Sequence, residues 1–442
     1  MQPWLAGSKN LTQFEKYLME ISIPYGDKQI PIDIPNEHLQ GVLAPNPVGE
    51  LRSEGEIITY ALQHPIQSRP LEEIVTAGDR LVVIIPDKTR CSRLEFVLPI
   101  LLGRLHLLGV QSEDILFLFA NGSHGAMTTA EKRTLLGETI FSTYHHEEHD
   151  CHRSETVYLG STTRGTPVYV NQLVRSDRKI LVVNSIVHHY FAGFGGGPKM
   201  IVPGVAGFQT ILSNHRYTVS TPDGILHPHC RPGNLEGNPV YQDILQAVNL
   251  VDVHFSLQVV LDSEHRIVGA FAGDLIAAFQ QGCTLVEKMN CVHIPEPADL
   301  VIVGCGGSPK DINLIQAHKA IHHAFQALKP DGVLIAFAEC SDGVGSQTFL
   351  LWFDYPTLTE MKKAVMANYQ LNGNTALALK EKLQRAHILL ISDLERGISQ
   401  RIGFVATENF AQAWEKARKL LPENFSVYVI PDGSITLPMV KR

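Results

Sequence analysis

Six short runs of consecutive apolar residues recur along the chain, and each ends in glycine or polar residues. They cover Leu81–Ile85, Ile115–Phe119, Ile180–Val183, Leu300–Val303, Val333–Phe337 and Ile388–Ile391. A strand that alternates apolar with polar residues has one wet face, whereas a continuously apolar strand is buried on both faces. The runs therefore predict sheets covered on both sides by helices, which is the α/β class.

Several of the intervening stretches have apolar residues at helical spacing. We expect helices over Leu94–Leu108, Ile312–Leu328 and Met361–Leu383. Two alternating runs within Phe255–Phe271 flank the sequence DSEHR and predict a hairpin, followed by a helix over Asp274–Met289.

The length of the chain favours two domains, because 442 residues exceed what one ordinary core accommodates. The proline-punctuated passage Val292–Asp299 is the expected boundary. We therefore expect two α/β domains. They would span residues 1–291 and 292–418, with residues 419–442 as a C-terminal segment that could return to the first domain.

Charge and composition exclude several classes of protein. The net charge of −8 argues against a surface that binds nucleic acid. No apolar run reaches the roughly 18 residues of a membrane span, and MQPWLAGSKNLTQFEKYLMEI does not resemble a secretion signal. Seven cysteines without a CxxC pair predict neither a zinc site nor a disulfide framework. We expect a cytoplasmic protein without nucleic-acid or membrane partners.

Polar clusters follow the predicted strands, at the ends where α/β proteins gather their chemistry. Arg90 follows the first strand and could hold a carboxylate or phosphate, oriented by Asp87, or it could form a structural ion pair in a solvated turn. His124 follows the second strand between two glycines. It could act as a general acid or base, or it could be an inert surface residue.

The segment HHYFAGFGGGPK places His189 and Lys199 on either side of a glycine cluster. Glycine permits close approach of the backbone to a ligand and leaves amides free for anions, although a tight turn would also need it. Neither standard phosphate pattern fits. Pro198 separates Gly197 from Lys199, and it also occupies the place of the third glycine of a dinucleotide loop.

Two further patterns have competing interpretations. Asn313, Gln316 and Lys319 share one face of a predicted helix, where an amide and an ammonium could bind an acid group or simply face water. The run HHEEHDCH at residues 145–152 looks like a metal cluster but lacks the HExxH order, and we interpret it as a solvated segment.

Taken in order along the chain, these motifs resemble those of the lactate racemase family of catalytic proteins. The motifs are D-x-x-R at Asp87–Arg90, G-x-H at Gly122–His124, HYFAGFGGGPK at His189–Lys199, His215 within SNHRY, and GGSPKDINLIQAHKA at Gly306–Ala320. The resemblance extends from about residue 80 to the C-terminus, and five separated motifs agree in order.

The resemblance implies a nickel-pincer nucleotide, a pyridinium mononucleotide whose two sulfur-bearing arms hold the metal, in the cleft between the two domains. Lys199 is implied to carry it covalently, and His215 to be the protein ligand of nickel. Further residues implied to lie at the cofactor are Asp87, Thr89, Gly195, Gly196 and Gly197. Cofactor-biosynthesis and nickel-insertion proteins are the implied partners.

The implied reaction is racemisation or epimerisation of a 2-hydroxy acid. The Cα–H of such an acid is too weakly acidic for a histidine to remove, so the hydrogen leaves as a hydride while a base takes the hydroxyl proton. His124 and His189 are implied to be the two bases, one for each enantiomer. Arg90, Gln316 and Lys319 are implied to hold the substrate carboxylate.

The sequence departs from the lactate enzymes near this site. Ile315 stands where they commonly have tyrosine, and Asn374 and Thr375 stand where they carry an aromatic residue. Related enzymes act on malate-like, aromatic, aliphatic or sugar-derived 2-hydroxy acids. The resemblance therefore implies the class of substrate and leaves its identity open.

Two other functions remain open at this level. A nicotinamide-dependent dehydrogenase of 2-hydroxy acids would share the carboxylate clamp, but Pro198 and Pro309 interrupt both glycine-rich candidates for its dinucleotide loop. A non-catalytic nucleotide-binding protein would have no need of His124 and His189.

Overall fold

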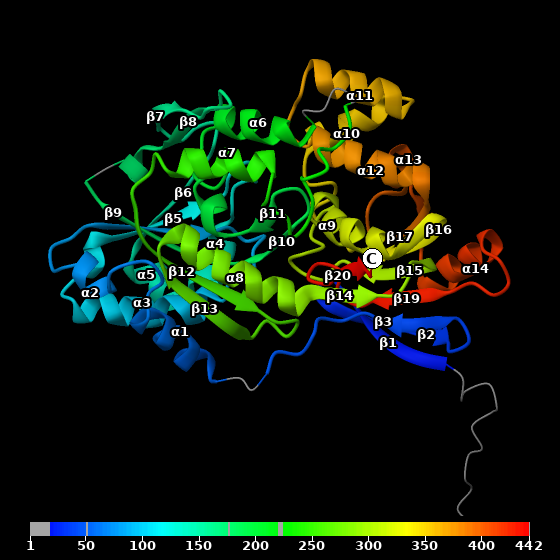
Figure 1. The fold of residues 1–442 in the computed structure, drawn as a ribbon, viewed down its shortest axis with the longest axis horizontal. Coiled ribbons are helices and arrows are strands. Elements are labelled where there is room, and N and C mark those ends of the chain that lie inside the picture. The colour runs from blue at the N-terminus through cyan, green and yellow to red at the C-terminus, as the bar shows by residue number, and fades with distance from the viewer. Residues whose placement is uncertain (1–17, 50–51, 176, 220–223, 442) are drawn as a thin grey trace, which may run out of the picture.

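The computed structural model describes residues 18–49, 52–175, 177–219 and 224–441. Figure 1 shows two units side by side, each built around a sheet with helices on its faces. The strand orders of the two large sheets are β13-β12-β9-β4-β5-β6 and β18-β17-β16-β15-β19-β3. The predicted α/β class is therefore confirmed.

The first sheet contains the first three predicted strands and the predicted hairpin. Its members are β4 (Leu81–Pro86), β5 (Ile115–Ala120), β6 (His145–Glu148), β9 (Lys179–Ser185), β12 (Val253–Leu261) and β13 (Ile267–Gly273). All neighbouring pairs are parallel except β12 and β13, which form the antiparallel hairpin. Val82 and Ile84 face one apolar core, while Val83 and Ile85 face another. Burial on both faces explains why this strand is apolar throughout.

Helices cover the two faces of the first sheet. They are α1 (Glu54–Gln63), α2 (Leu71–Ile74), α3 (Leu94–Leu107), α4 (Thr129–Leu136), α5 (Glu138–Thr143), α6 (Phe208–Arg216), α7 (Pro239–Val248) and α8 (Leu275–Asn290). A second, smaller hairpin, β7 (Thr156–Ser161) with β8 (Pro167–Asn171), lies beside α6. Asp274 caps α8 through hydrogen bonds to the N–H groups of Ile276 and Ala277, so this helix begins where the sequence predicts.

The second sheet is entirely parallel. It contains β3 (Leu39–Val42), β15 (Ala298–Gly304), β16 (Leu328–Phe337), β17 (His387–Ile391), β18 (Val405–Thr407) and β19 (Val427–Ile430). The hairpin of β1 (Leu18–Tyr25) and β2 (Lys28–Pro35) packs on one face together with α14 (Phe410–Leu420). The remaining helices of this unit are α9 (Leu314–Ala324), α10 (Gln347–Leu351), α11 (Leu358–Ala367), α12 (Gly373–Arg385) and α13 (Arg396–Ile402).

The expected division of the chain was two domains, residues 1–291 and 292–418, and a C-terminal segment, residues 419–442. Strand pairing at the two ends of the chain differs from this division. β3 pairs with β19 and so joins the second sheet rather than the first, and the hairpin of β1 and β2 packs on that same sheet (Figure 1). The C-terminal segment also stays with the second unit, because β19 pairs with β15, and β20 (Leu437–Val440) pairs with β14 (Cys291–Ile294). Apolar patterning identifies a strand, but it does not identify the partner of that strand.

Two predicted helices differ from the structure. The single helix expected over Met361–Leu383 is two helices, α11 and α12, because the chain turns at Asn372, whose φ of 68° is left-handed. The Asn-Gly pair at this turn is a breaker signal that overrides the apolar spacing. The helix expected to end at Leu328 ends as α9 at Ala324, and Leu328 already belongs to β16. No helix in the described ranges is long and apolar enough to cross a membrane.

Candidate active site

A cavity of about 310 Å³ lies between the two units. Residues that follow β4, β5 and β9 line one side, and residues of α9 and of the corner between α11 and α12 line the other. All of the predicted site residues except Gly197 line it: Asp87, Thr89, Arg90, His124, His189, Gly195, Gly196, Lys199, His215, Gln316 and Lys319. The structure thus brings together residues that are separated by more than two hundred positions.

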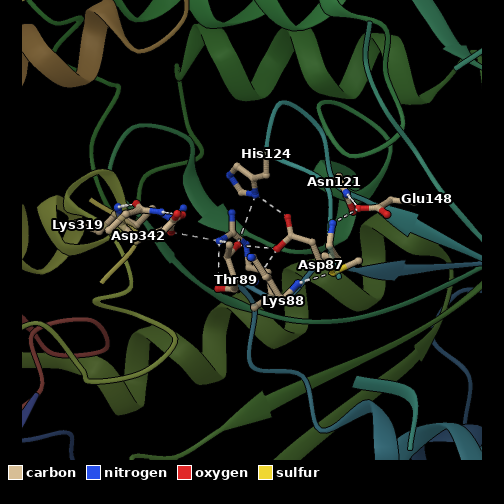
Figure 2. A network of polar contacts seen from close by, with 12 residues as sticks. Asp87, Lys88, Thr89, Asn121, His124, Glu148, Lys319 and Asp342 are labelled. Carbon is tan, nitrogen blue, oxygen red and sulfur yellow. Dashed lines mark hydrogen bonds and ion pairs between the residues drawn. The ribbon is translucent and has the colours of Figure 1, made fainter. Parts of the chain in front are cut away.

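Asp87 directly follows β4 and is 3% exposed. Its Oδ2 lies 2.5 Å from Nδ1 of His124, and its Oδ1 accepts hydrogen bonds from the backbone N–H of Thr89 at 2.8 Å and the hydroxyl of Thr89 at 2.6 Å (Figure 2). Burial alone would raise the pKa of Asp87. The charge and hydrogen bond of His124, with Arg90 and Thr89, outweigh burial and hold that pKa well below its usual range.

The ionised Asp87 determines which nitrogen of His124 is free. A carboxylate only accepts hydrogen bonds, so Nδ1 of His124 must donate to it. In the neutral ring Nε2 then keeps its lone pair. The side chain of His124 is 33% exposed, so solvent reaches this ring. The sequence predicted that Asp87 orients Arg90, but the side-chain hydrogen bonds of Asp87 go to His124 and Thr89 instead.

Arg90, Gln316 and Lys319 meet across the cavity from opposite units. Nη1 of Arg90 donates to the Thr89 hydroxyl at 2.9 Å and to Oε1 of Gln316 at 3.4 Å. Nζ of Lys319 donates to the same Oε1 at 2.5 Å. Burial, followed by the charges of Arg90, Lys310 and Lys199, lowers the pKa of Lys319 well below its usual range. Such a concentration of positive charge favours an anionic ligand.

The N-terminus of α9 is fixed by a side-chain cap. Oδ1 of Asn313 accepts from the backbone N–H of Gln316 at 3.1 Å, while its Nδ2 donates to Asp342 at 3.4 Å. The cap fixes the first turn of the helix. Gln316 and Lys319 then project from one face, as the sequence predicted.

His189 ends β10 (Val187–His189), which forms a short hairpin with β11 (Gly193–Gly195). Its Nδ1 accepts from the backbone N–H of Ala192 at 3.3 Å, and its ring packs edge-on against Phe191 at 4.5 Å between ring centres. Burial lowers the pKa of His189 well below its usual range, and the charges of Lys199, Lys319 and Arg90 lower it further. The ring is therefore neutral at physiological pH.

The glycines after this hairpin are needed chiefly for contacts within the protein. Gly196 has φ of 84°, and a Cβ there would meet the carbonyl oxygen of Ser185. Gly197 has φ of 51°, a Cβ there would meet the ring of Phe279, and its N–H donates to Oδ1 of Asn184 at 2.9 Å. Of the three glycines predicted to approach a ligand, Gly195 and Gly196 line the cavity and Gly197 does not.

Lys199 and His215 both lie close to the Phe191 ring. Nζ of Lys199 is 5.2 Å from the centre of that ring, and the His215 ring stands edge-on to it at 5.1 Å. Burial, with a smaller effect of Arg90, lowers the pKa of Lys199 to about 7. Burial, with the charge of Lys199, lowers the pKa of His215 to about 3. Both residues are thus available as neutral electron-pair donors.

The run HHEEHDCH is not simply the solvated segment that the sequence predicted. Its first half is the edge strand β6, and Glu148 pairs with Lys132 at 2.5 Å. Glu148 also accepts a hydrogen bond from Asn121 (Figure 2). His149 is fully buried, and its two ring nitrogens contact the carbonyl of Ala206 and the amide of Asn171. Among the described residues, no group of three or more His, Cys, Asp and Glu side chains is arranged to hold a metal ion.

Sequence reasoning missed several residues of the cavity wall. Asn184 and Ser185 end β9, and Ser185 donates to the carbonyl of Cys91 at 2.6 Å, which fixes the turn next to Arg90. Their place at the carboxyl end of a buried strand was a signal that could have identified them. Tyr190 also lines the cavity, but nothing in its apolar context distinguishes it from a core residue.

Comparison with known sequences assigns both units. The family models described as the lactate racemase N-terminal domain and the lactate racemase C-terminal domain match residues 25–224 and 294–437. The chain is 35% identical to the lactate racemase of Thermoanaerobacterium thermosaccharolyticum over 429 residues, which cover 94% of this chain and 98% of the relative. It is 30% identical to the lactate racemase of Lactiplantibacillus plantarum over 433 residues, which cover 94% and 99%.

Solved structures agree with this assignment. The lactate racemase apoprotein from Thermoanaerobacterium thermosaccharolyticum superposes with a TM-score of 0.85 at 30% identity, over 96% of this chain and all of that chain. A protein from Thermotoga maritima superposes with a TM-score of 0.71 at 17% identity, over 90% of this chain, and at that identity it shares the fold alone.

Proposed function

The chain belongs to the lactate racemase family and is an isomerase, and we propose that it racemises or epimerises a 2-hydroxy acid with a nickel-pincer nucleotide attached to Lys199. The observation that carries the proposal is the meeting of two imidazoles, His124 and His189, in one cavity with the Arg90–Gln316–Lys319 cluster. Family membership favours this function over the dehydrogenase and the non-catalytic binding protein left open by the sequence.

Arg90 and Lys319 would bind the substrate carboxylate. Two cations held close together in a partly buried site repel each other, and an anion between them relieves that repulsion. Gln316 keeps both cations in place, because its amide oxygen accepts from each. The substrate would therefore be held by its carboxylate, with Cα and the hydroxyl group directed into the cavity.

The two histidines would move the hydroxyl proton. His124 can accept a proton at Nε2, because Asp87 binds Nδ1 and stabilises the positive ring that results. His189 is neutral at rest and lies among positively charged groups, so it readily returns a proton once it has gained one. The two enantiomers present the hydroxyl in different directions, so each would use a different histidine.

Lys199 and His215 fit the family cofactor. Burial lowers the pKa of Lys199 to about 7, so a large share of its amine is uncharged near neutral pH, as formation of a covalent bond to nitrogen requires. His215 lines the cavity, and burial with the charge of Lys199 lowers its pKa to about 3, so its ring is a neutral donor that a metal could use. When bound, the nickel-pincer nucleotide supplies an acceptor for the hydride that leaves Cα. Because the described residues hold no cluster of three protein ligands, the nucleotide itself would supply most of the nickel ligands.

Production together with the cofactor-biosynthesis and nickel-insertion proteins tests this proposal. The purified protein should show an adduct in its intact mass, and should interconvert the enantiomers of at least one 2-hydroxy acid. Lys199→Ala should lose the adduct and the activity together. Lys88→Ala is a matched control, because Lys88 also lines the cavity but pairs with Glu131 at 2.7 Å. A fully active enzyme without an adduct would contradict the proposal.

A further inference from the structure

A buried hydrogen-bond network joins the segment that carries His189 to the other unit. Tyr190 follows His189 in the chain and is 3% exposed. Its hydroxyl lies 2.5 Å from Oγ1 of Thr375 and accepts from Nδ2 of Asn374 at 3.3 Å. Thr375 and Asn374 belong to the first turn of α12, so the contact crosses between the units.

The same network reaches the helix that carries His215. The hydroxyl of Tyr369, in the turn before α12, donates to Oδ1 of Asn374 at 2.9 Å and lies close to the side chain of Thr218. Oγ1 of Thr218 in turn contacts the backbone carbonyl of His215 at 2.7 Å. The corner between α11 and α12 thus touches both segments that hold the candidate base and the candidate metal ligand.

Tyr190 also contacts the helix that carries the carboxylate-binding pair. Its ring stands edge-on to His318 at 5.2 Å and lies 5.6 Å from His322, both on α9. Gln316 and Lys319 come from the same helix. A shift of Tyr190 would therefore change the distance between His189 and the point at which the substrate is held.

Burial makes these polar contacts act together. Asn374 is 1% exposed and Thr218 is fully buried, so neither can exchange a lost partner for bulk water. Removing one hydroxyl leaves its partners unsatisfied, and buried networks of this kind rearrange as a unit.

We propose that Tyr190, Asn374 and Thr375 are positioning residues, which fix His189 relative to helix α9 through hydrogen bonds across the two units. They act through His189 and not on the substrate. This inference rests on the proposed function, in which His189 is a base. Displacement of a reacting group by about 1 Å can lower a rate about 10²-fold, so loss of the network should lower kcat much more than it changes KM.

Variants of Thr375 isolate the hydroxyl from the shape of the side chain. In the cofactor-loaded enzyme, Thr375→Val keeps the volume but removes the hydroxyl, and should lower kcat about 10-fold to 10²-fold, with KM nearly unchanged. Thr375→Ser restores the hydroxyl and should recover most of kcat. Tyr190→Phe should match Thr375→Val, and the double variant should cost little more than either single change, because both remove the same interaction.

Hydrogen exchange of the cofactor-free protein gives a readout that does not depend on activity. Backbone amides of residues 187–195 should exchange faster in Thr375→Val and Tyr190→Phe than in Thr375→Ser, while amides of β4 stay unchanged in all three. Equal exchange and equal kcat for the Val and Ser variants would overturn the inference. So would a rise in KM at constant kcat, because it would assign these residues to substrate binding. If the loaded wild-type enzyme racemises no 2-hydroxy acid, the proposed function fails. The hydrogen-exchange comparison would still show whether the network holds residues 187–195 in place.

Discussion

The buried carboxylate of Asp87 pairs with the partly exposed imidazole of His124, with 2.5 Å between Oδ2 and Nδ1. The carboxylate is held in turn by the backbone N–H and the hydroxyl of Thr89. The pair comes from the ends of two neighbouring parallel strands, β4 and β5. This arrangement orients the imidazole before any substrate arrives, and it stabilises the charge that the ring would gain on accepting a proton.

Asp87→Asn tests the importance of this pair. An amide can donate a hydrogen bond to Nδ1 as well as accept one, so it no longer fixes the free lone pair on Nε2. We expect kcat of the loaded enzyme to fall by about 10²–10⁴-fold, with the adduct mass retained. Asp342→Asn is the control, because Asp342 also lines the cavity but is exposed and does not contact His124. An unchanged kcat in Asp87→Asn would refute the role of the pair.

His124 and His189 should serve opposite enantiomers. Each turnover needs one histidine to remove the hydroxyl proton and the other to restore it, so His124→Ala and His189→Ala should each lose racemisation in both directions, by about 10²–10⁴-fold. Supplied with single enantiomers deuterated at Cα, each variant should still transfer deuterium from only one of them to the cofactor, and the two variants should differ in which one. Substantial steady-state racemisation by both variants would show that these are not the two bases.

His215→Ala should release nickel while leaving the nucleotide on Lys199. The physical reason is that His215 is a buried, neutral donor in the cavity wall, whereas the covalent bond involves a different residue. Metal analysis and intact mass measure the two properties separately. His152→Ala serves as the control, since His152 is exposed in the histidine-rich run and stacks on Phe208. Nickel lost from the His152 variant but kept in the His215 variant would place the metal elsewhere.

Gly196→Ala should destabilise the fold far more than Gly195→Ala. Left-handed backbone costs a residue with a Cβ about 1–2 kcal/mol, and at Gly196 the new methyl group would also displace the carbonyl of Ser185. The backbone φ of Gly195 is not left-handed, and the nearest neighbour of a Cβ there would be Cγ2 of Val187 at 3.4 Å. Urea unfolding of the two variants measures the difference, and equal free energies of unfolding would show that the hairpin adjusts.

Lys382 should make the free energy of unfolding depend on pH. Burial lowers its pKa from 10.5 to about 7 in the folded protein, with Nζ bonded only to the carbonyl of Ala378 among the contacts described. Between these two values the unfolded chain binds a proton that the folded chain lacks, so the contribution of Lys382 to stability should rise with pH from about 7 to 10.5 and should no longer change with pH below about 7. Lys382→Met should flatten this rise, whereas Lys380→Met on the same helix should not. If both variants keep the wild-type slope, the source of the pH dependence lies elsewhere.

Much of the fold follows from local sequence. The strand Leu81–Pro86 is apolar throughout because both of its faces are buried, and Asp274 marks the start of α8 because it caps that helix. Pairing could not be derived in the same way, because β3 meets β19 across nearly four hundred residues and no local pattern records that contact. Asn372 and the glycine after it indicate the break before α12, but the apolar spacing favoured one continuous helix over Met361–Leu383.

The residues of the candidate site could also be predicted only in part. Chemically distinctive residues such as Arg90, His124 and Lys199 follow strands or lie among glycines, and the cavity contains them. The interaction of Asp87 with His124 depends on the register of β4 against β5, which the sequence does not state. Tyr190 could not be identified, because the partners of its hydroxyl, Thr375 and Asn374, belong to the other unit.

The contact between β3 and β19 bears on the order in which the protein is made. Strands of the first sheet all lie within residues 81–273, so that sheet can form while synthesis is still in progress. The second sheet needs residues 39–42, which are made before the first sheet, and residues 427–430, which are made after it. β3 therefore cannot pair with β19 until every strand of the first sheet has been synthesised. The first sheet can thus position Arg90 and His124 before Gln316 and Lys319 are made.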